Sequence, residues 1–202
     1  IKDRFPDTLQ LAAFSIVIGT LMAVPIGLLS AVKRGSAVDY FAKSLALLGQ
    51  SAPPFWLGLI LMWLFAVKLD LVDSGGKGGL VSFFLPGVTM SLFWMAAIVR
   101  LLRSSMLDAL DSEYVRLARI KGVPEWKVIC KHALRNASLV PLTYFGLIIG
   151  QLAIGSVSIE TVFNWPGLGA LSVEAVLVRD YPLVQAIVLF FSCLFIVINL
   201  LV

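Results

Sequence analysis

Charged residues are scarce in this sequence: Asp, Glu, Lys and Arg make up 14% of its 202 residues. Soluble domains carry about 25%. The mean hydropathy is +0.96, and apolar runs of the length needed to cross a bilayer recur along the chain. The composition therefore excludes an ordinary soluble domain. It predicts an all-α, polytopic integral membrane protein, with residues 1–202 forming a single transmembrane domain.

Cysteine and histidine are also scarce, with two cysteines and one histidine. Cys130 lies in a polar interval and Cys193 in an apolar run, so no disulfide framework is expected. His132 alone offers neither a metal cluster nor a nucleophile–base pair, and we expect it to be an interfacial helix residue. The sequence therefore predicts a protein that is not an enzyme and holds no metal or cofactor of its own.

The predicted spans have no Asp, Glu or His in the middle. Five apolar segments are long enough to cross a bilayer about 30 Å thick, at approximately residues 8–32, 39–68, 83–110, 138–162 and 181–202. Carriers coupled to protons or sodium usually place ionisable groups at this depth, although backbone carbonyls can also bind the ion. The absence favours a transporter or receptor driven from outside the membrane.

The sequence also lacks an initial Met and a complete phosphate-binding motif. The sequence starts at Ile1 without Met and stops at Val202 inside an apolar run, so we expect both ends to be truncated. The glycine-rich loop DSGGKGG lacks the Ser or Thr that must follow the lysine of a phosphate-binding loop, because Gly78 follows Lys77. We expect this loop to be a flexible turn.

The positive charges are unevenly distributed. Eleven of the sixteen Lys and Arg residues lie at the C-terminal end of the first or third span or in the segment that follows it, and the other five are Lys2, Arg4, Lys68, Lys77 and Arg179. By the positive-inside rule, the polar interval Glu113–Pro141 is cytoplasmic, and the DSGGKGG and FNWPGLG loops face outward.

The polar interval predicts two short helices over residues 111–137. Asp111 or Ser112 can cap a helix that starts at Glu113, and Gly122 is placed to end it. Pro124 suits the start of a second helix. A basic amphipathic loop can simply lie on anionic lipid, but the glycine turn favours a docking element.

Two motifs interrupt the apolar segments. SAPPFWLG predicts a kinked or broken helix, because successive prolines remove two backbone donors. FNWPGLG separates the fourth predicted span from a short amphipathic piece, and its Pro166-Gly167 is typical of a turn.

Five motifs in order resemble one family. They are SAPPFWLG, RLLRSSML, the pair EYVRLARIKG and HALRNASLVP, ETVFNWPGLG, and RDYPLVQ. Together they resemble the permease subunits of binding-protein-dependent ABC importers, and the peptide/nickel branch fits best. The polar interval resembles that family's EAA loop. The broad pattern has Glu-Ala-Ala before the glycine, whereas Arg116, Leu117 and Ala118 stand here, so only Ala118 and Gly122 match.

The resemblance implies a type I ABC importer transmembrane domain with a cytoplasmic coupling helix pair, in the inner membrane of a prokaryote. It implies a second permease subunit, two cytoplasmic ATPase subunits that bind the ATP, an extracytoplasmic solute-binding protein and surrounding lipid, with no nucleic acid. The solute would be a peptide, a nickel chelate or a glutathione-like compound. The implied coupling residues are Glu113, Tyr114, Arg116, Ala118, Arg119, Gly122 and Trp126. The resemblance also implies that FNWPGLG lies at the outer mouth, where it is either a plain turn or, through Trp165 and its neighbours, lines the outer gate or meets the binding protein; SAPPFWLG either only sets the kink or also lines the path. The candidate gate or path residues are Ser51, Pro53, Phe55, Trp56, Asn164, Trp165, Pro166 and Gly167. The alternative is an ATP-independent carrier or channel with a basic, lipid-bound loop.

Overall fold

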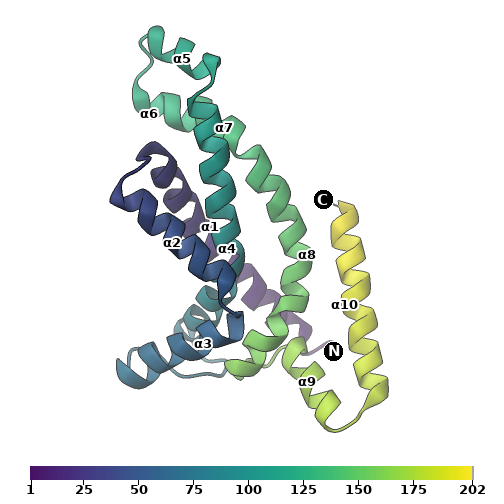
Figure 1. The fold of residues 1–202 in the computed structure, drawn as a ribbon. Helices are drawn as coiled ribbons and strands as arrows, with labels where there is room; N and C mark the ends of the chain where they lie inside the picture. The colour runs from purple at the N-terminus through teal and green to yellow at the C-terminus, as the bar shows by residue number, and fades with distance from the viewer. Residues whose placement is uncertain (202) are drawn as a thin grey trace. The chain divides into compact units, whose positions relative to one another are not determined.

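The computed structural model describes residues 1–201, and all of their side chains except those of residues 80, 149, 150 and 152–155. Every regular element within the described chain is helical, as predicted (Figure 1). Val202, the last residue of the predicted final span, lies outside the described residues. The α-helices are α1 (Phe5–Val32), α2 (Ala37–Ser51), α3 (Pro54–Met62), α4 (Phe84–Leu110), α5 (Glu113–Ile120), α6 (Glu125–Lys127), α7 (Leu134–Ala137), α8 (Leu139–Val162), α9 (Leu168–Leu177) and α10 (Tyr181–Leu201). Two π-helical segments, η1 (Trp63–Lys68) and η3 (Val128–Ala133), and one 3-10 turn, η2 (Leu80–Phe83), complete the order.

Three helices of the described chain are long and apolar enough to cross a membrane by themselves. They are Phe5–Val32, Val81–Leu110 and Tyr181–Leu201, with hydropathies of 2.2, 1.7 and 2.6. They coincide with three predicted spans, at residues 8–32, 83–110 and 181–202.

The predicted span at residues 39–68 is broken. Its two halves, Ala37–Ser51 and Pro54–Lys68, are bent by 111°. Pro53 is extended, with φ −60 and ψ 134, before Pro54 opens α3, because a residue before proline avoids the α-helical region. The predicted break is confirmed, and the segment is either a broken span or a re-entrant one.

Helix α8 has 24 residues, but its apolar part with fully described side chains is Leu139–Ile148. The fifth span, predicted at residues 138–162, therefore stays a prediction.

The chain divides into two compact units. Unit 1 holds Ile1–Gly19, Ser51–Trp94 and Gly146–Val202, and unit 2 holds Thr20–Gln50 and Met95–Phe145. The prediction of a single domain is not tested by this division, because α1, α4 and α8 each run through both units.

A buried carboxylate organises unit 2. Asp39 has no exposed surface, and it accepts hydrogen bonds from Arg103 Nε at 2.6 Å and Arg103 Nη2 at 3.0 Å. Ser30 Oγ, at 2.7 Å, and the Gly35 backbone N–H, at 2.9 Å, also donate to it. A buried charge needs such partners to be tolerated, so this cluster fastens the end of α1, the start of α2 and the middle of α4 together.

A second buried carboxylate organises unit 1. Glu160 has no exposed surface; its Oε1 accepts from Thr8 Oγ1 at 2.8 Å and its Oε2 from the Ala170 N–H at 3.0 Å. The Thr8 hydroxyl accepts in turn from the Leu168 N–H at 2.8 Å. Both backbone donors belong to the first turn of α9, where N–H groups lack partners within the helix and favour an anion. The carboxylate therefore closes the turn between α8 and α9.

Candidate coupling site

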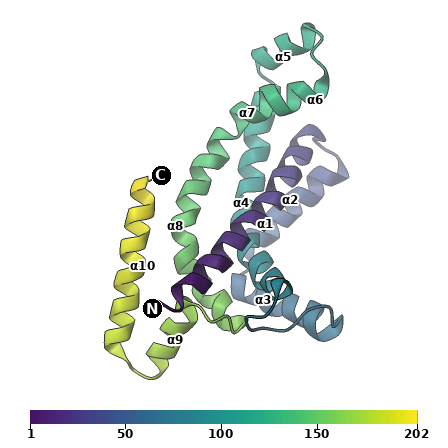
Figure 2. The ribbon, with the colours of Figure 1, turned by 180° about the vertical axis from the view of Figure 1, so that it is seen from behind.

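The first helix of the polar interval begins where the sequence predicts. Ser112 is extended, with φ −77 and ψ 153, and α5 starts at Glu113. The carboxylate of Glu113 suits the first turn because the N-terminal end of a helix is electropositive. Figures 1 and 2 both show α5 and α6 beyond the C-terminal end of α4, within unit 2.

Gly122 closes α5 with a Schellman motif. The Val123 N–H donates to Ala118 O at 3.2 Å and the Gly122 N–H donates to Arg119 O at 2.9 Å, which are the two bonds that define this motif. Gly122 has φ +76, a left-handed conformation that side-chain-bearing residues rarely adopt. The glycine therefore fixes the direction in which the chain leaves α5, and the predicted turn is confirmed.

The two helical segments pack against each other through small and branched side chains. Val115 and Ala118 of α5 share one buried cluster with Val128 and Ala133 of η3, and with Met106 of α4. Ala118, predicted as a coupling residue, is only 7% exposed. Its side chain therefore packs in the buried cluster that holds the two helical segments together.

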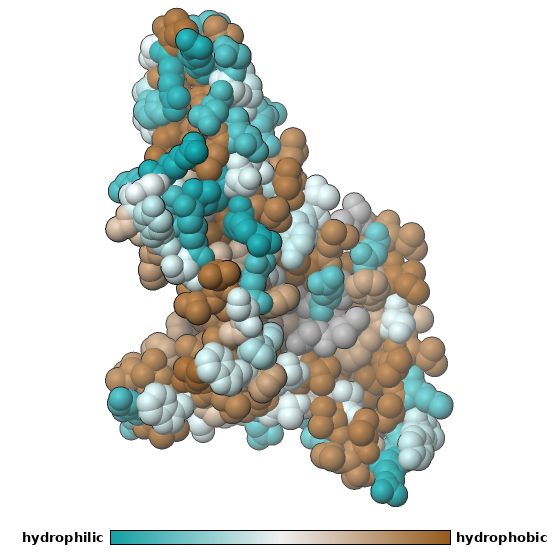
Figure 3. Space-filling view, in the orientation of Figure 1, coloured by the Kyte–Doolittle hydropathy of each residue, from teal (hydrophilic) through white to brown (hydrophobic). Residues whose placement is uncertain are grey.

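The outer face of the pair is apolar and exposed. The exposed fractions are 41% for Tyr114, 54% for Leu117, 73% for Ile120 and 63% for Trp126. We call these four residues the apolar face of the helix pair. Trp126, predicted as a coupling residue, is therefore accessible on the surface of the pair. Hydrophilic residues gather around this part of unit 2 in Figure 3, with apolar residues among them.

Two ion pairs flank the turn. Arg119 donates to Glu125 at 2.8 Å from Nη2 and at 3.2 Å from Nε, so it links α5 to the start of α6. This bond with Arg119 holds the pKa of the Glu125 carboxyl below its usual value. Arg116 lies 3.8 Å from Glu113, and both side chains are largely exposed. Arg116, where the broad pattern has a glutamate, therefore points to solvent, with only a weak ion pair.

The structure brings three motifs of unit 1 together around Phe163. A Cβ at Gly58, in SAPPFWLG, would lie 3.1 Å from the Phe163 ring. The Gly76 N–H, in DSGGKGG, donates to Phe163 O at 2.8 Å, and Lys77 pairs with Asp7. The glycine-rich loop is therefore fastened to FNWPGLG, which its composition does not reveal.

Two of the predicted gate residues belong to the packing of unit 1. Trp165 is 1% exposed, its Nε1 donates to Asp7 O at 3.0 Å, and its ring meets Phe83 edge-on. Gly167 is buried, and a Cβ there would lie 2.3 Å from the Glu160 carboxylate. Their assignment to a gate or path stays a prediction.

The other gate candidates are more accessible. Phe55 and Trp56 on α3 are 47% and 49% exposed. Ser51 ends α2, and Pro53 stands in the break. Asn164 is exposed, with φ +48, and Pro166 is half-buried. Only the exposed members of this set can meet a solute or a partner in this conformation.

Sequence reasoning missed both buried carboxylates. Asp39 stands at the edge of one predicted span and Glu160 near the end of another, so the sequence does not distinguish either of them from a surface acid. The glycines of WPGLG were the one available signal for Glu160, because Gly167 and Gly169 leave room for its carboxylate. No cluster of three His, Cys, Asp or Glu side chains suited to a metal ion is found in the described part of the chain.

Known proteins are similar to this chain over almost its whole length. Residues 23–202 match the family model of the binding-protein-dependent transport system inner membrane component. The chain is 37% identical to the dipeptide transport system permease protein DppB of Escherichia coli (strain K12), over 98% of this chain and 68% of that protein. It is 43% identical to the glutathione transport system permease protein GsiC of Salmonella typhimurium (strain LT2), over 100% of this chain and 66% of that protein.

The chain thus spans about two thirds of the length of the relatives that it matches. The family model covers most of the chain, and both relatives are permeases of peptide-type transport systems. From its helical, membrane-spanning architecture and these matches, the chain belongs to the family of binding-protein-dependent transport system inner membrane components, as a permease of the peptide-type ABC importers.

Proposed function

We propose that this chain is a membrane-spanning subunit of an ATP-driven importer for peptides or glutathione-like solutes. Its relatives are a dipeptide and a glutathione permease, which supports this solute class. The ATP would be hydrolysed by separate subunits, and an extracytoplasmic binding protein would deliver the solute. A second permease subunit would complete the path.

The apolar face of the helix pair carries the proposal for coupling. Tyr114, Leu117, Ile120 and Trp126 are between 41% and 73% exposed, on a pair whose other side is packed against α4. An amphipathic helix that lays such a face into an apolar groove is a common mode of recognition. Here the apolar face of the helix pair would enter a groove on a cytoplasmic ATPase subunit.

Rigidity makes the pair suitable for transmitting force. The Schellman turn at Gly122 and the Arg119–Glu125 ion pair fix α5 relative to α6. The shared core with Met106 joins both to α4. A shift of the docked pair would therefore move α4 as a rigid body, which is how closure of the ATPase subunits would reach the spans.

The competing function, an ATP-independent carrier with a lipid-bound loop, needs the same apolar face to lie in lipid. The Schellman turn argues against this, because a helix lying on a membrane surface needs no sharp reversal after two turns.

A tryptophan exchange tests the docking. Replacing Trp126 by Ala is expected to weaken co-purification of the ATPase subunits by about tenfold or more, because exposed aromatic anchors dominate such interfaces. Trp63→Ala is a matched control: Trp63 is 56% exposed, and a lysine stands 5.3 Å from its ring as Lys127 does from the ring of Trp126.

Unchanged ATPase retention by Trp126→Ala would reject the docking role, as would an equal loss with Trp63→Ala. Uptake by the wild-type protein in ATP-depleted vesicles would support the carrier instead.

A further inference from the structure

The ion pair of Asp39 and Arg103 joins two helices that are far apart in the chain. Asp39 lies on α2, and Arg103 lies on α4, 64 residues later. The Asp39 carboxylate is fully buried, and the Arg103 side chain is 19% exposed. Two parallel hydrogen bonds, at 2.6 Å and 3.0 Å, fix the orientation of the two groups as well as their separation. The pair therefore holds α2 and α4 in one relative position within unit 2.

The polar cluster around Asp39 is continuous with the buried core of the helix pair. On α1, Ser30 donates to Asp39 at 2.7 Å, and the next residue, Ala31, belongs to the apolar cluster that Met106 shares with the helix pair. On α4, Met106 follows Arg103 by three residues, so the two side chains are neighbours on the helix surface. A shift of the helix pair would therefore reach the Asp39 carboxylate through packed side chains of α1 and α4.

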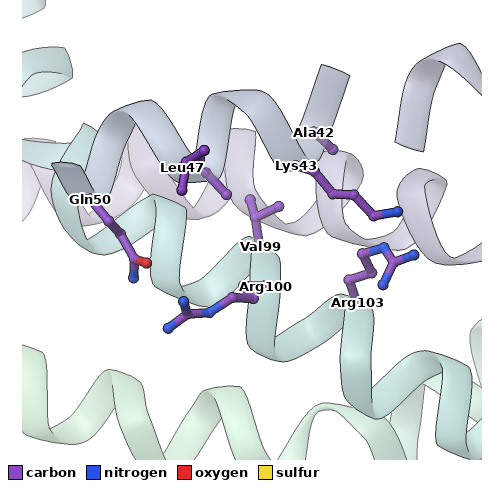
Figure 4. Close-up of a pocket in the computed structure, with 8 residues that line it drawn as sticks. Ala42, Lys43, Leu47, Gln50, Val99, Arg100 and Arg103 are labelled. Atoms are coloured by element: carbon purple, nitrogen blue, oxygen red, sulfur yellow. The ribbon is translucent and has the colours of Figure 1, made fainter. Parts of the chain in front are cut away.

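Farther along α2, the contact with α4 opens into a pocket. The pocket has a volume of about 290 Å³ and lies between the two helices. Figure 4 shows Gln50 and Arg100 toward one end of it, and Lys43 and Arg103 toward the other. Because forces pass only between atoms in contact, the ion pair beside the Arg103 end links the two helices more directly than the walls of the pocket do.

We propose that Asp39 and Arg103 are positioning residues of coupling, which make the α1–α2 turn and α2 follow α4 when the docked helix pair moves. The role rests on the proposed function, because the ATPase subunits would supply the movement. Helix α2 ends at Ser51, at the break before α3, so the movement of α2 continues along the chain to the bend of the broken segment. Lys43 adds no link between helices, because it pairs with Asp39 from within α2, at 3.0 Å.

Transport per ATP tests this role. The full-length permease would be reconstituted in vesicles with its ATPase subunits, the second permease subunit and the binding protein, and uptake of radiolabelled dipeptide or glutathione would be measured together with ATP hydrolysis. Arg103→Gln is expected to lower the solute transported per ATP by about two- to thirtyfold, the range for residues that carry coupling between sites. Lys43→Gln is the matched control, because it removes a cation from the same carboxylate without separating two helices; it should leave this ratio unchanged.

A double variant guards against a loss of folding. Arg103→Gln leaves a buried carboxylate without its bidentate partner, which is costly. Asp39→Asn combined with Arg103→Gln removes both charges, so it leaves no uncompensated ion in the cluster. This double variant should also transport less solute per ATP, at an unchanged amount of protein in the membrane.

Spin labels distinguish transmission of movement from support of the fold. Ser44 on α2 and Ser104 on α4 are exposed, so Ser44→Cys and Ser104→Cys would carry the labels in a complex whose permease has Cys130→Ser and Cys193→Ser. With the native ion pair, the distance between the labels is expected to be the same with and without a non-hydrolysable ATP analogue. In the double variant it should change by about 1–2 Å when the analogue is added, the size of helix shifts at interfaces, because α4 then moves without α2.

Two results would overturn the role of the ion pair. One is a double variant with the wild-type ratio of transport to ATP hydrolysis and a constant label distance. The other is an equal loss of coupling in Lys43→Gln. Wild-type uptake that needs no ATP would reject the proposed function and this role with it, whereas ATP-driven uptake that survives loss of the ion pair would reject this role alone.

Discussion

The two buried carboxylates show how much single residues decide in this protein. Asp39 and Glu160 have no exposed surface, and each is satisfied by donors from several segments. Removing one partner from a buried charge is costly, because the charge is then left without compensation. These two side chains therefore specify which helix ends meet within each unit.

Gly167 should be intolerant of even one added methyl group. Its φ of −97 suits any residue, but a Cβ there would lie 2.3 Å from the Glu160 carboxylate. Gly167→Ala is expected to lower the free energy of unfolding by about 1–3 kcal/mol, the usual cost of overpacking. Thermal unfolding of the purified protein measures this.

Gly79→Ala provides the control for Gly167→Ala. No heavy atom lies within 4 Å of a Cβ at Gly79, and its φ is −73. An unchanged melting temperature for Gly167→Ala, or a loss equal to that of the Gly79 variant, would contradict the buried role of the carboxylate.

At the level of elements, the sequence predicts the two helices of the pair, but it does not predict which side of each helix is buried. Ser112, Gly122 and Pro124 mark the helix ends by local backbone chemistry, which is readable from sequence. Which side of α5 is buried depends on α4 and η3, whose contacts are not local. The sequence therefore predicts the turn but not the burial of Ala118.

The turn of the helix pair should be needed for coupling and not for insertion. Gly122→Val forces a β-branched residue into φ +76, at about 1–2 kcal/mol or more, although a Cβ meets nothing within 4 Å. We expect ATP-driven uptake to fall while the amount of protein in the membrane stays the same. Uptake and ATP hydrolysis in reconstituted vesicles measure the uncoupling.

Gly35→Val is the control that separates a loss of coupling from a general effect of backbone strain. Gly35 also has φ +76 and an empty Cβ position, but it stands in the turn between α1 and α2. Loss of coupling in the Gly122 variant alone would support the proposed role. Equal loss in both variants, or normal uptake by Gly122→Val, would contradict it.

At the scale of the whole molecule, the sequence predicts the membrane class and the family but not how SAPPFWLG, DSGGKGG and FNWPGLG pack together. Apolar length and ordered motifs are properties of the sequence itself, and both agree with the described spans and the family match. The convergence of Gly58, Gly76 and Phe163 joins segments far apart in the chain. No local pattern predicts this convergence, nor the contacts with Asp7 and Phe83 that bury Trp165.

The proposed topology can be read from thiol labelling. Cys130 is exposed on the helix pair, so in a Cys193→Ser background it serves as a native probe of that side. Ser74 is exposed in the DSGGKGG loop, and Ser74→Cys in a protein lacking both cysteines probes the other side. A membrane-impermeant maleimide added to intact cells is expected to label Ser74→Cys at once and Cys130 only after permeabilisation, because the basic segments stay in the cytoplasm. Labelling of Cys130 in intact cells would contradict the predicted orientation. The apolar face of the helix pair would then lie on the wrong side of the membrane to meet cytoplasmic ATPase subunits.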